Sequence, residues 1–350
     1  EARGYSAWDP TSPAFIKDEV LCVPTAFCSY SGEALDKKTP LLRSMATLDK
    51  QTKRVLALFG KNPAHVTVNV GTEQEYFLIS EKDYERRQDL IVCGRTLFGA
   101  PPCKGQELDE HYFGAIRPTV NSFMKELDDE LWGFAVAAKT KHNEVAPCQH
   151  ELAPVFCNVN RAVDENLLTM EMMKLLASHH GLVCLQHEKP FEGINGSGKH
   201  NNWSFGTEDE NLLDPGDTPE ANLQFIVFLT CVIEAVDNYQ DLLRMSVASC
   251  GNDHRLGAHE APPAIISIFL GDELSSIIDA LTSGETAAHT LREQLDFGVD
   301  VLPNLERDTT DRNRTSPFAF TGNKFEFRML GASASVSCTS ISRVLSSGSV

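Results

Sequence analysis

The stretch GINGSGKHNNWS, residues 193–204, separates two possible fold classes. Its first eight residues match the phosphate-loop pattern G-x-x-x-x-G-K-[ST], except that His200 stands where the pattern has Ser or Thr. A phosphate loop must open a helix, because backbone N–H groups at the helix N-terminus hold the phosphates. Here Asn, Ser and Gly follow, which disfavour a propagating helix. The pattern therefore argues against a phosphate-loop NTPase, although Lys199 and His200 remain chemically able to bind a phosphate and a metal.

Hydrophobic periodicity around this stretch indicates long helices mixed with scattered strands. We expect helices over residues 41–60, 165–181 and 220–251, the last of them apolar nearly all round and therefore buried. Residues 65–79 and 323–330 alternate with the period of a strand. The strands do not form regular βαβ units and no internal repeat is apparent, which favours the α+β class.

The amino-acid composition limits the possible classes of function and partner. The chain has 350 residues and a formal net charge of −18, which argues against nucleic acid or an anionic membrane as a partner and is compatible with cation binding. There is no apolar run long enough for a membrane span. The ten cysteines include no C-x-x-C pair, which indicates reduced, mostly buried thiols in a cytosol-like compartment.

The two ends of the sequence suggest a piece of a longer protein. The chain begins with Glu1 rather than Met, and no signal peptide is recognisable. Its last stretch, SASVSCTSISRVLSSGSV, is rich in Ser and has little apolar periodicity.

Two glutamates stand close together in the strand expected over residues 65–79. Glu73 and Glu75 are two residues apart, so both side chains point to the same face. Two like charges side by side cost free energy unless water surrounds them or a cation lies between them. A solvated face is the simpler explanation. The neighbouring Val70 and Tyr76 indicate a partly buried strand, which weakens that explanation.

Another acidic set lies in the motif NEVAPCQHELAP. Glu144 and Glu151 stand seven residues apart there, with His142 and His150 nearby. An ordinary surface loop would also explain this set.

Two further sets pair acidic residues with cations. Glu326 and Arg328 alternate on one strand face, for which an ion pair is an adequate explanation. The motif DHRLGAHEAPP places Arg255, His259 and Glu260 on a loop that contains Gly and Pro. Together with His200, the acidic sets supply five carboxylates and an imidazole, a ligand set that suits two hard divalent cations such as Mg²⁺ or Mn²⁺. Pattern alone leaves open whether they converge in space.

The order and spelling of five motifs resemble those of glutamine synthetase, specifically the long type III enzymes. The resemblance runs from about residue 2 to residue 331 through EQEYFLI, NEVAPCQHELAP, HEKPFEGINGSGKHNNWS, HRLGAHEAPPAIIS and DRNRTSPFAFTGNKFEFRMLG. It implies an α+β catalytic domain over residues 1–331, with a curved antiparallel sheet that is lined by active-site residues and flanked by helices. Residues 332–350 are then a divergent tail, and the N-terminal β-grasp domain of the family is largely absent.

The family condenses L-glutamate with ammonium to form glutamine, with ATP as the phosphoryl donor and two divalent cations, Mg²⁺ or Mn²⁺. By resemblance, one metal is held by Glu75, Glu144 and Glu151. The other metal is held by Glu73, His200 and Glu326.

The resemblance also implies substrate-binding and catalytic roles. Asn195, Gly196 and Arg255 would bind glutamate, and Ser204, Phe156 and Lys199 would lie at the nucleotide. Arg314 and Arg328 would neutralise phosphates, and Glu260 would take a proton from ammonium on a closing flap. Ala319 falls where the shorter enzymes have a second phosphate-region arginine, a lack that type III chains share, and Arg312 is a candidate substitute.

The implied assembly is a homo-oligomer of stacked rings, a dodecamer whose active sites are shared between subunits. We therefore expect little activity from the 350-residue piece by itself. The expected location is the cytoplasm, with organellar import left open. Two other functions remain as alternatives, namely a related carboxylate–amine ligase that uses another amine and a non-catalytic ATP or glutamate sensor.

Overall fold

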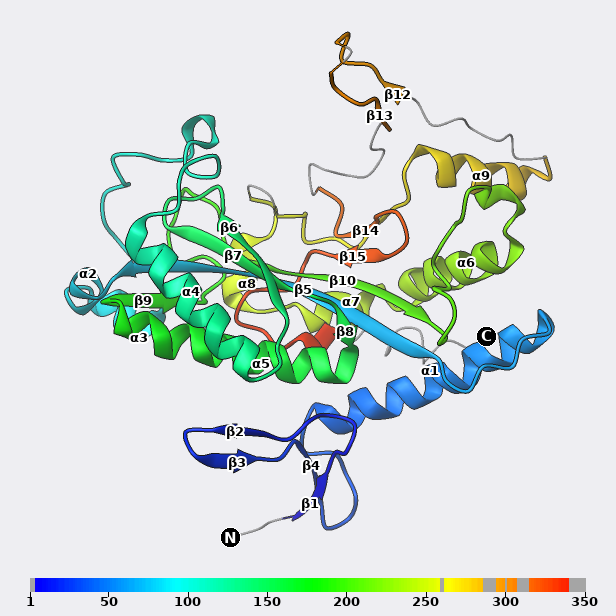
Figure 1. Ribbon diagram of the computed structural model, residues 1–350, viewed down its shortest axis with the longest axis horizontal. Coiled ribbons are helices and arrows are strands. Elements are labelled where there is room, and N and C mark those ends of the chain that lie inside the picture. The colour runs from blue at the N-terminus through cyan, green and yellow to red at the C-terminus, as the bar shows by residue number, and fades with distance from the viewer. Residues whose placement is uncertain (1–3, 259–260, 286–293, 300, 307–314, 340–350) are drawn as a thin grey trace.

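A nine-stranded sheet forms the centre of the structure (Figure 1). The computed structural model describes residues 4–258, 261–285, 294–299, 301–306 and 315–339. Along the sheet the strand order is β11-β14-β15-β10-β5-β7-β6, and β8 and β9 also pair with β5. All pairs are antiparallel except β11 with β14. The strands are β5 (Thr67–Ser80), β6 (Ala138–Asn143), β7 (Gln149–Pro154), β8 (Cys157–Asn158), β9 (Leu182–Leu185), β10 (Lys199–Gly206), β11 (Ile268–Phe269), β14 (Phe318–Phe320) and β15 (Phe325–Phe327).

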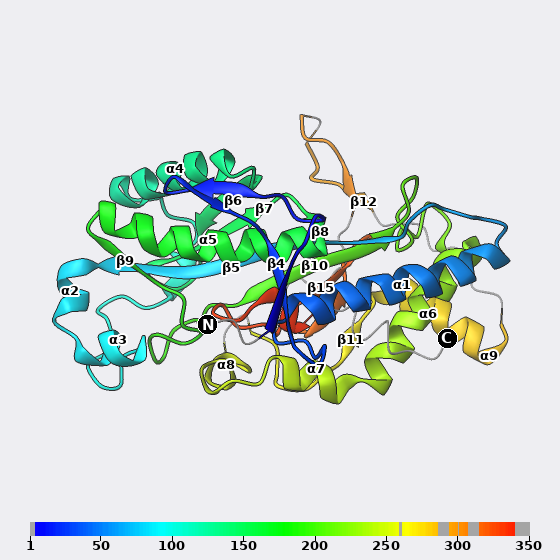
Figure 2. The same cartoon turned by 90° about the horizontal axis from the view of Figure 1, so that it is seen from below.

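Helices surround this sheet and confirm the expected α+β class. In Figures 1 and 2, α4 and α5 run along one face of the sheet, and α6 and α9 lie near one end of it. The α-helices are α1 (Lys38–Leu58), α2 (Glu81–Glu85), α3 (Gln88–Cys93), α4 (Pro118–Gly133), α5 (Val159–His179), α6 (Leu223–Asn238), α7 (Gln240–Ser246), α8 (Cys250–Arg255) and α9 (Asp272–Ser283). Short 3₁₀ turns occur at η1 (Glu107–Asp109), η2 (Pro219–Ala221) and η3 (Val336–Thr339).

Three two-stranded sheets lie outside the central sheet. Near the N-terminus, β1 (Gly4–Trp8) pairs with β4 (Thr25–Ser29), and β2 (Phe15–Lys17) pairs with β3 (Val20–Cys22). The third joins β12 (Gln294–Leu295) to β13 (Leu305–Glu306).

Side chains of the long strand β5 alternate between the helical face of the sheet and its polar face. Val68 and Val70 belong to one apolar core and Tyr76 to a second, and both cores include residues of α5. Glu73, which alternates with these residues, lines a pocket on the opposite face. The period-2 pattern therefore predicted the strand, and the structure shows that its two faces lie in different environments.

Aromatic packing fixes the neighbouring strands β10, β14 and β15. The ring of Trp203 stacks on Phe325, its partner across the ladder, at 5.5 Å between centroids, and Phe318 packs against both. Such pairs contribute about 1 kcal/mol each beyond the burial of their area. They hold β10 and β15 in the register that brings His200 near Glu326.

All three expected helices have different bounds in the structure, and the one expected over residues 41–60 runs from Lys38 to Leu58 as α1. Helix α5 begins at Val159, because the side chain of Asn158 accepts a hydrogen bond from the N–H of Asn160 and caps it there. The helix expected over residues 220–251 is divided into η2, α6, α7 and α8, and a new cap at Ser249 begins the last of these. Helix α6 is also not buried all round, since Glu234 is exposed.

The structure tests two expectations from the sequence, namely that GINGSGKH is not a phosphate loop and that no segment spans a membrane. Strand β10 begins at Lys199, so a strand follows the GINGSGKH motif where a phosphate loop requires a helix. No helix in the described ranges combines the length and the apolar character needed to cross a bilayer.

The nine cysteines whose side chains the structure describes are free but less buried than the sequence suggested. Among the described residues assigned a burial class, Cys184 alone is buried, and Cys93, Cys103 and Cys250 are exposed. Several cysteines lie on surface loops and short helices, where a small apolar side chain is tolerated without a core around it.

A buried ion-pair network attaches the N-terminal segment to α5. The ammonium of Lys38 donates hydrogen bonds to Asp9 at 2.8 Å, Asn160 at 2.9 Å and Asp164 at 2.7 Å. Asp9 is 4% exposed. Burial by itself raises the pKa of Asp9, but the hydrogen bonds from Lys38, Thr11 and Asn160 outweigh it and hold the pKa below its ordinary value of 3.8.

We expect Lys38→Met to lower the free energy of unfolding by about 3 kcal/mol, because it leaves the Asp9 carboxylate buried without its cation. The loss should be complete above pH 3.8 and should shrink as the pH falls further, since protonation then removes the charge on Asp9. Urea denaturation of Lys38→Met beside Lys50→Met, an exposed lysine on the same helix, measures both effects. Equal midpoints for the two variants would show that the network does not stabilise the fold.

Candidate active site and metal centre

One face of the central sheet gathers polar side chains from five strands or their ends. In the ladders, Glu73 on β5 lies opposite His200 on β10, and Glu75 lies opposite Glu151 on β7. Residues directly opposite in a ladder point to the same face. Glu326 on β15 lies opposite Asn202, two residues from His200 and therefore also on this face.

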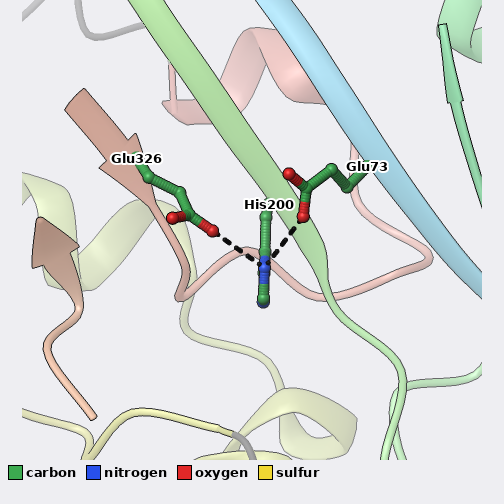
Figure 3. Close-up of side chains that lie close together, drawn as sticks. All are labelled: Glu73, His200 and Glu326. Atoms are coloured by element: carbon green, nitrogen blue, oxygen red, sulfur yellow. Dashed lines mark ion pairs between the residues drawn. The ribbon is translucent and has the colours of Figure 1, made fainter. Parts of the chain in front are cut away.

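The His200 cluster, which we define as Glu73, His200 and Glu326, forms at the centre of this face (Figure 3). The Nδ1 atom of His200 lies 3.3 Å from Oε2 of Glu73 and 3.2 Å from Oε1 of Glu326. His200 is 2% exposed. The imidazole thus stands between two carboxylates, shielded from solvent.

Neighbouring polar groups orient the two carboxylates of the His200 cluster. The amide of Asn202 donates to Oε1 of Glu73 at 2.7 Å, and Nη2 of Arg328 donates to Oε2 of Glu326 at 2.9 Å. Burial by itself would raise the pKa of Glu326, but His200 and Arg328 outweigh it and hold that pKa well below its usual range. Glu326 is therefore a carboxylate at neutral pH.

The His142 cluster, which we define as His142, Glu144 and Glu151, is a second such group. Nε2 of His142 lies 3.2 Å from Oε1 of Glu151, and Nδ1 of His142 lies 3.6 Å from Oε1 of Glu144. The hydrogen bond to Glu151 is the main reason that the pKa of His142 rises to about 9. Burial raises the pKa of Glu151, and the nearby charges of Glu73 and Glu75 add to that shift. Glu73 of the His200 cluster therefore acts electrostatically on Glu151 of the His142 cluster.

Glu75 does not join the His142 cluster, contrary to the ligand set that the resemblance implied. Its Oε2 accepts a hydrogen bond from the N–H of Gly198 at 2.5 Å, so the carboxylate turns toward the 193–198 loop. His142 occupies the third place in the cluster instead. His150, noted beside Glu151 in the sequence, is also outside it. That ring packs against Tyr76, and burial lowers the pKa of His150 to about 3.

Both clusters fit a divalent cation by their chemistry. In each, one imidazole nitrogen and two carboxylate oxygens lie within 4.8 Å of one another. Oε2 of Glu151 is buried and has no hydrogen-bond partner, a costly state for an ionised oxygen that a bound cation would relieve. Oxygen-rich ligands with one imidazole suit Mg²⁺ or Mn²⁺.

A pocket of about 1250 Å³ opens over this face of the sheet. Six of the residues singled out in the sequence line it. They are Glu73, Glu144, Phe156, Ser204, Glu326 and Arg328. The hydroxyl of Ser204 donates to Asn211, and Phe156 is 66% exposed, so its ring is accessible to a ligand.

The residues predicted to bind glutamate gather at one place but are buried. Gly196 packs on the side chain of Arg255, and Asn195 is 1% exposed. Arg255 ends helix α8 instead of lying on a loop. Its guanidinium donates to main-chain carbonyls of residues 328–330 and to Asn252, and it does not line the pocket. In the structure, Arg255 therefore holds the chain after β15.

Lys199 does not fit the nucleotide-binding role predicted for it. Because it alternates with His200 on β10, its side chain points to the opposite, helical face of the sheet. There its ammonium donates to Asn166 at 2.8 Å and to the carbonyl of Ala334, and the residue is 0% exposed. The structure corrects this prediction.

Several predicted residues lie outside the described part of the chain. Glu260 and Arg314, together with His259 and Arg312, fall in the ranges 259–260 and 307–314. Their roles stay predictions.

The sequence pattern did not assign a role to every residue at this face. Asn202 orients Glu73, and the alternation of His200, Asn202 and Ser204 along one strand could have identified it. His142 was noted only as a neighbour of Glu144. Its position directly opposite Glu151 depends on the β6–β7 register, which the sequence did not fix.

Comparisons with known proteins support one family. Residues 1–44 match the family model "Glutamine synthetase type III N terminal", and residues 50–266 match "Glutamine synthetase, catalytic domain". The chain is 54% identical over 339 residues to a protein of Dictyostelium discoideum named "Type-3 glutamine synthetase", and 56% identical over 326 residues to a "Glutamine synthetase" of Butyrivibrio fibrisolvens. These matches cover 95% and 93% of the chain but 46% of each relative, so the chain spans about half of their length.

A solved structure shares the fold. The chain resembles the structure titled "CryoEM Plasmodium falciparum glutamine synthetase" with a TM-score of 0.64 and 15% sequence identity. The match covers 98% of the chain and 61% of that structure. At this identity the likeness concerns the fold.

Proposed function

The chain belongs to the glutamine synthetase family, and from that premise we propose that it forms the catalytic part of an ATP-dependent ligase. This ligase condenses L-glutamate with ammonia to L-glutamine and so serves nitrogen assimilation. The observation that carries the proposal is the convergence of the His200 and His142 clusters on one sheet face. Arg328 contacts the first cluster, and a large pocket opens over this face.

The metal-binding residues follow from the two clusters. Glu73, His200 and Glu326 would hold one divalent cation, and Glu144 and Glu151 would hold the other. His142 or Glu75 would complete the second set, since His142 already lies in the cluster and Glu75 lies opposite Glu151 in the β5–β7 ladder. Bound Mg²⁺ or Mn²⁺ would offset the charge of these carboxylates and of the ATP phosphates.

Arginine side chains and a loop glutamate of the chain would serve the two chemical steps. A γ-carboxylate oxygen of glutamate attacks the terminal phosphorus of ATP and releases ADP, which gives γ-glutamyl phosphate. Ammonia then attacks the acyl carbon and expels phosphate. Arg328, which lines the pocket, would stabilise the charge on the transferred phosphoryl group, and Arg314 would assist it. Glu260 would accept the proton that ammonium loses.

Substrate binding would use residues on either side of these clusters. Asn195, Gly196 and Arg255 would bind glutamate, whose carboxylate can replace the neutral carbonyls that Arg255 now contacts, because charge-assisted hydrogen bonds are stronger. The exposed ring of Phe156 and the hydroxyl of Ser204 would contact the nucleotide, since an adenine base stacks well on an accessible aromatic ring.

We also propose a homo-oligomer, a dodecamer of stacked rings with shared active sites, in the cytoplasm. Large apolar side chains on the two N-terminal sheets support subunit contacts, since Trp8, Ile16 and Leu21 are 65%, 68% and 65% exposed. The free cysteines among the described residues support a reducing compartment.

Formation of γ-glutamyl hydroxamate from glutamate, ATP, Mg²⁺ and hydroxylamine tests the proposed reaction in the complete protein. We expect product with the wild type and a loss of more than about a hundredfold with Glu151→Gln, because the amide removes a charged metal ligand. Glu130→Gln, an exposed site on α4, should keep full activity.

Two other results would change the proposed function. ATP binding without any hydroxamate would support a sensor. Glutamate-dependent phosphate release with an organic amine but not with ammonia would support a ligase of another amine.

A further inference from the structure

A buried carboxylate that the proposed reaction does not use lies beside the glutamate-binding residues. Glu188 follows β9 in the motif HEKPFEG and is 4% exposed. A carboxylate is seldom buried unless it is paired and hydrogen-bonded, because desolvation of the charge costs several kcal/mol. Its partners therefore indicate why the chain keeps a charge there.

Glu188 connects two segments that are far apart in the sequence. Its main-chain carbonyl accepts a hydrogen bond from Ser197 at 2.8 Å, within the 193–198 loop. Its side chain accepts hydrogen bonds through Oε1 from the N–H of Ser333, at 3.2 Å, and from the hydroxyl of Ser333. It thereby links the loop before His200 to the chain that follows Arg328.

A third segment, helix α8, approaches Glu188 through a glycine. A Cβ atom added at Gly251 would lie 2.6 Å from Oε2 of Glu188, and one added at Gly331 would lie 2.6 Å from Oε1. A Cβ at Gly196 would collide with the Glu188 carbonyl oxygen. Glycine is required at all three contacts because any side chain would push the carboxylate or its backbone away.

Arg255, at the end of α8, packs against the same glycine as Glu188, since a Cβ atom added at Gly196 would collide with the Glu188 carbonyl oxygen and would lie 3.0 Å from Cγ of Arg255. It is 2% exposed, and a Cβ added at Gly198 would collide with its guanidinium. Burial lowers the pKa of Arg255, and the negative charges of Glu75 and Glu188 oppose that shift. The carboxylates of Glu75 and Glu188 therefore offset part of the cost of burying the guanidinium.

We propose that Glu188 is a positioning residue for glutamate binding. Its carboxylate holds Ser333 after β15 and packs against Gly251 of α8, while its main-chain carbonyl holds the 193–198 loop, so that Asn195, Gly196 and Arg255 present their polar groups together. Glu188 does not touch the substrate. This inference rests on the proposed function, because it assumes that these residues bind glutamate.

The decisive variant is Glu188→Gln, which keeps the shape of the side chain but replaces the charged acceptor of the Ser333 hydrogen bonds with a neutral and weaker one. We expect the KM for glutamate to rise about tenfold or more, with the KM for ATP and the Tm nearly unchanged. Glu192→Gln is the matched control, since Glu192 is exposed on the same segment. Glu188→Ala, which also loses the Ser333 hydrogen bonds, should raise the same KM and lower the Tm.

An unchanged KM for glutamate in Glu188→Gln would overturn the proposal, and so would an equal rise in the KM values for glutamate and ATP. Hydrogen exchange of the substrate-free protein gives a test that does not depend on activity. Amides of residues 331–333 should exchange faster in Glu188→Gln than in Glu192→Gln, because the side chain accepts from Ser333, and equal rates would overturn the positioning role. Absence of hydroxamate in the wild type would instead contradict the proposed function.

Discussion

Replacing His200 with alanine is expected to weaken Mn²⁺ binding by at least about tenfold and to lower hydroxamate formation more than about a hundredfold. The imidazole lies 3.3 Å and 3.2 Å from the carboxylates of Glu73 and Glu326. Without it, the cation loses one donor, and the two carboxylates lose the group that separates their charges. Titration followed by the electron paramagnetic resonance signal of free Mn²⁺ measures the affinity without any assay of turnover.

His65→Ala is the matched control for this prediction. His65 is exposed near the start of β5, and its imidazole takes part in neither the His200 cluster nor the His142 cluster. Circular dichroism should show that both variants remain folded, because the aromatic packing of Trp203 and Phe325 does not involve His200. Mn²⁺ titrations of His200→Ala that coincide with those of the wild type would remove the metal assignment of this cluster.

Sequence pattern predicted those features that depend on local periodicity. The alternation over residues 65–79 predicted a strand with Glu73 and Glu75 on one face, and the ladders of β5 confirm it. The absence of a helix after the GINGSGKH motif followed from residues with poor helix propensity, and β10 confirms it. In both cases the deciding interactions join residues that are close in the sequence, so the sequence alone is enough to predict the feature.

Features that depend on tertiary contacts were not predictable in this way. Lys199 is chemically able to bind phosphate, yet strand alternation and the acceptor on Asn166 direct it to the helical face. Glu75 turns away from the His142 cluster because the N–H of Gly198 offers it a hydrogen bond. The contact of Glu188 with Ser333 joins positions 145 residues apart, and no spacing rule relates them. Such contacts require the assembled fold.

Replacing Arg328 with lysine is expected to lower kcat for hydroxamate formation about a hundredfold while the KM for glutamate stays within about twofold. Arg328 is 2% exposed, lines the pocket and donates through Nη2 to Glu326 at 2.9 Å. Its planar guanidinium can bind that carboxylate and a phosphate oxygen at the same time. A lysine ammonium is a single point charge at the end of a flexible chain and cannot reproduce this geometry.

The lysine variant separates the geometry of Arg328 from its charge, because Arg328→Ala removes both. Loss of the cation in Arg328→Ala also removes one of the groups that keep the pKa of Glu326 low, so its metal affinity should fall at acidic pH more than that of Arg328→Lys. Arg43→Lys, at an exposed site on α1, should behave like the wild type. A kcat for Arg328→Lys within about twofold of the wild type would show that charge alone suffices there, and stabilisation of the transferred phosphoryl group by the guanidinium fork would have to be abandoned.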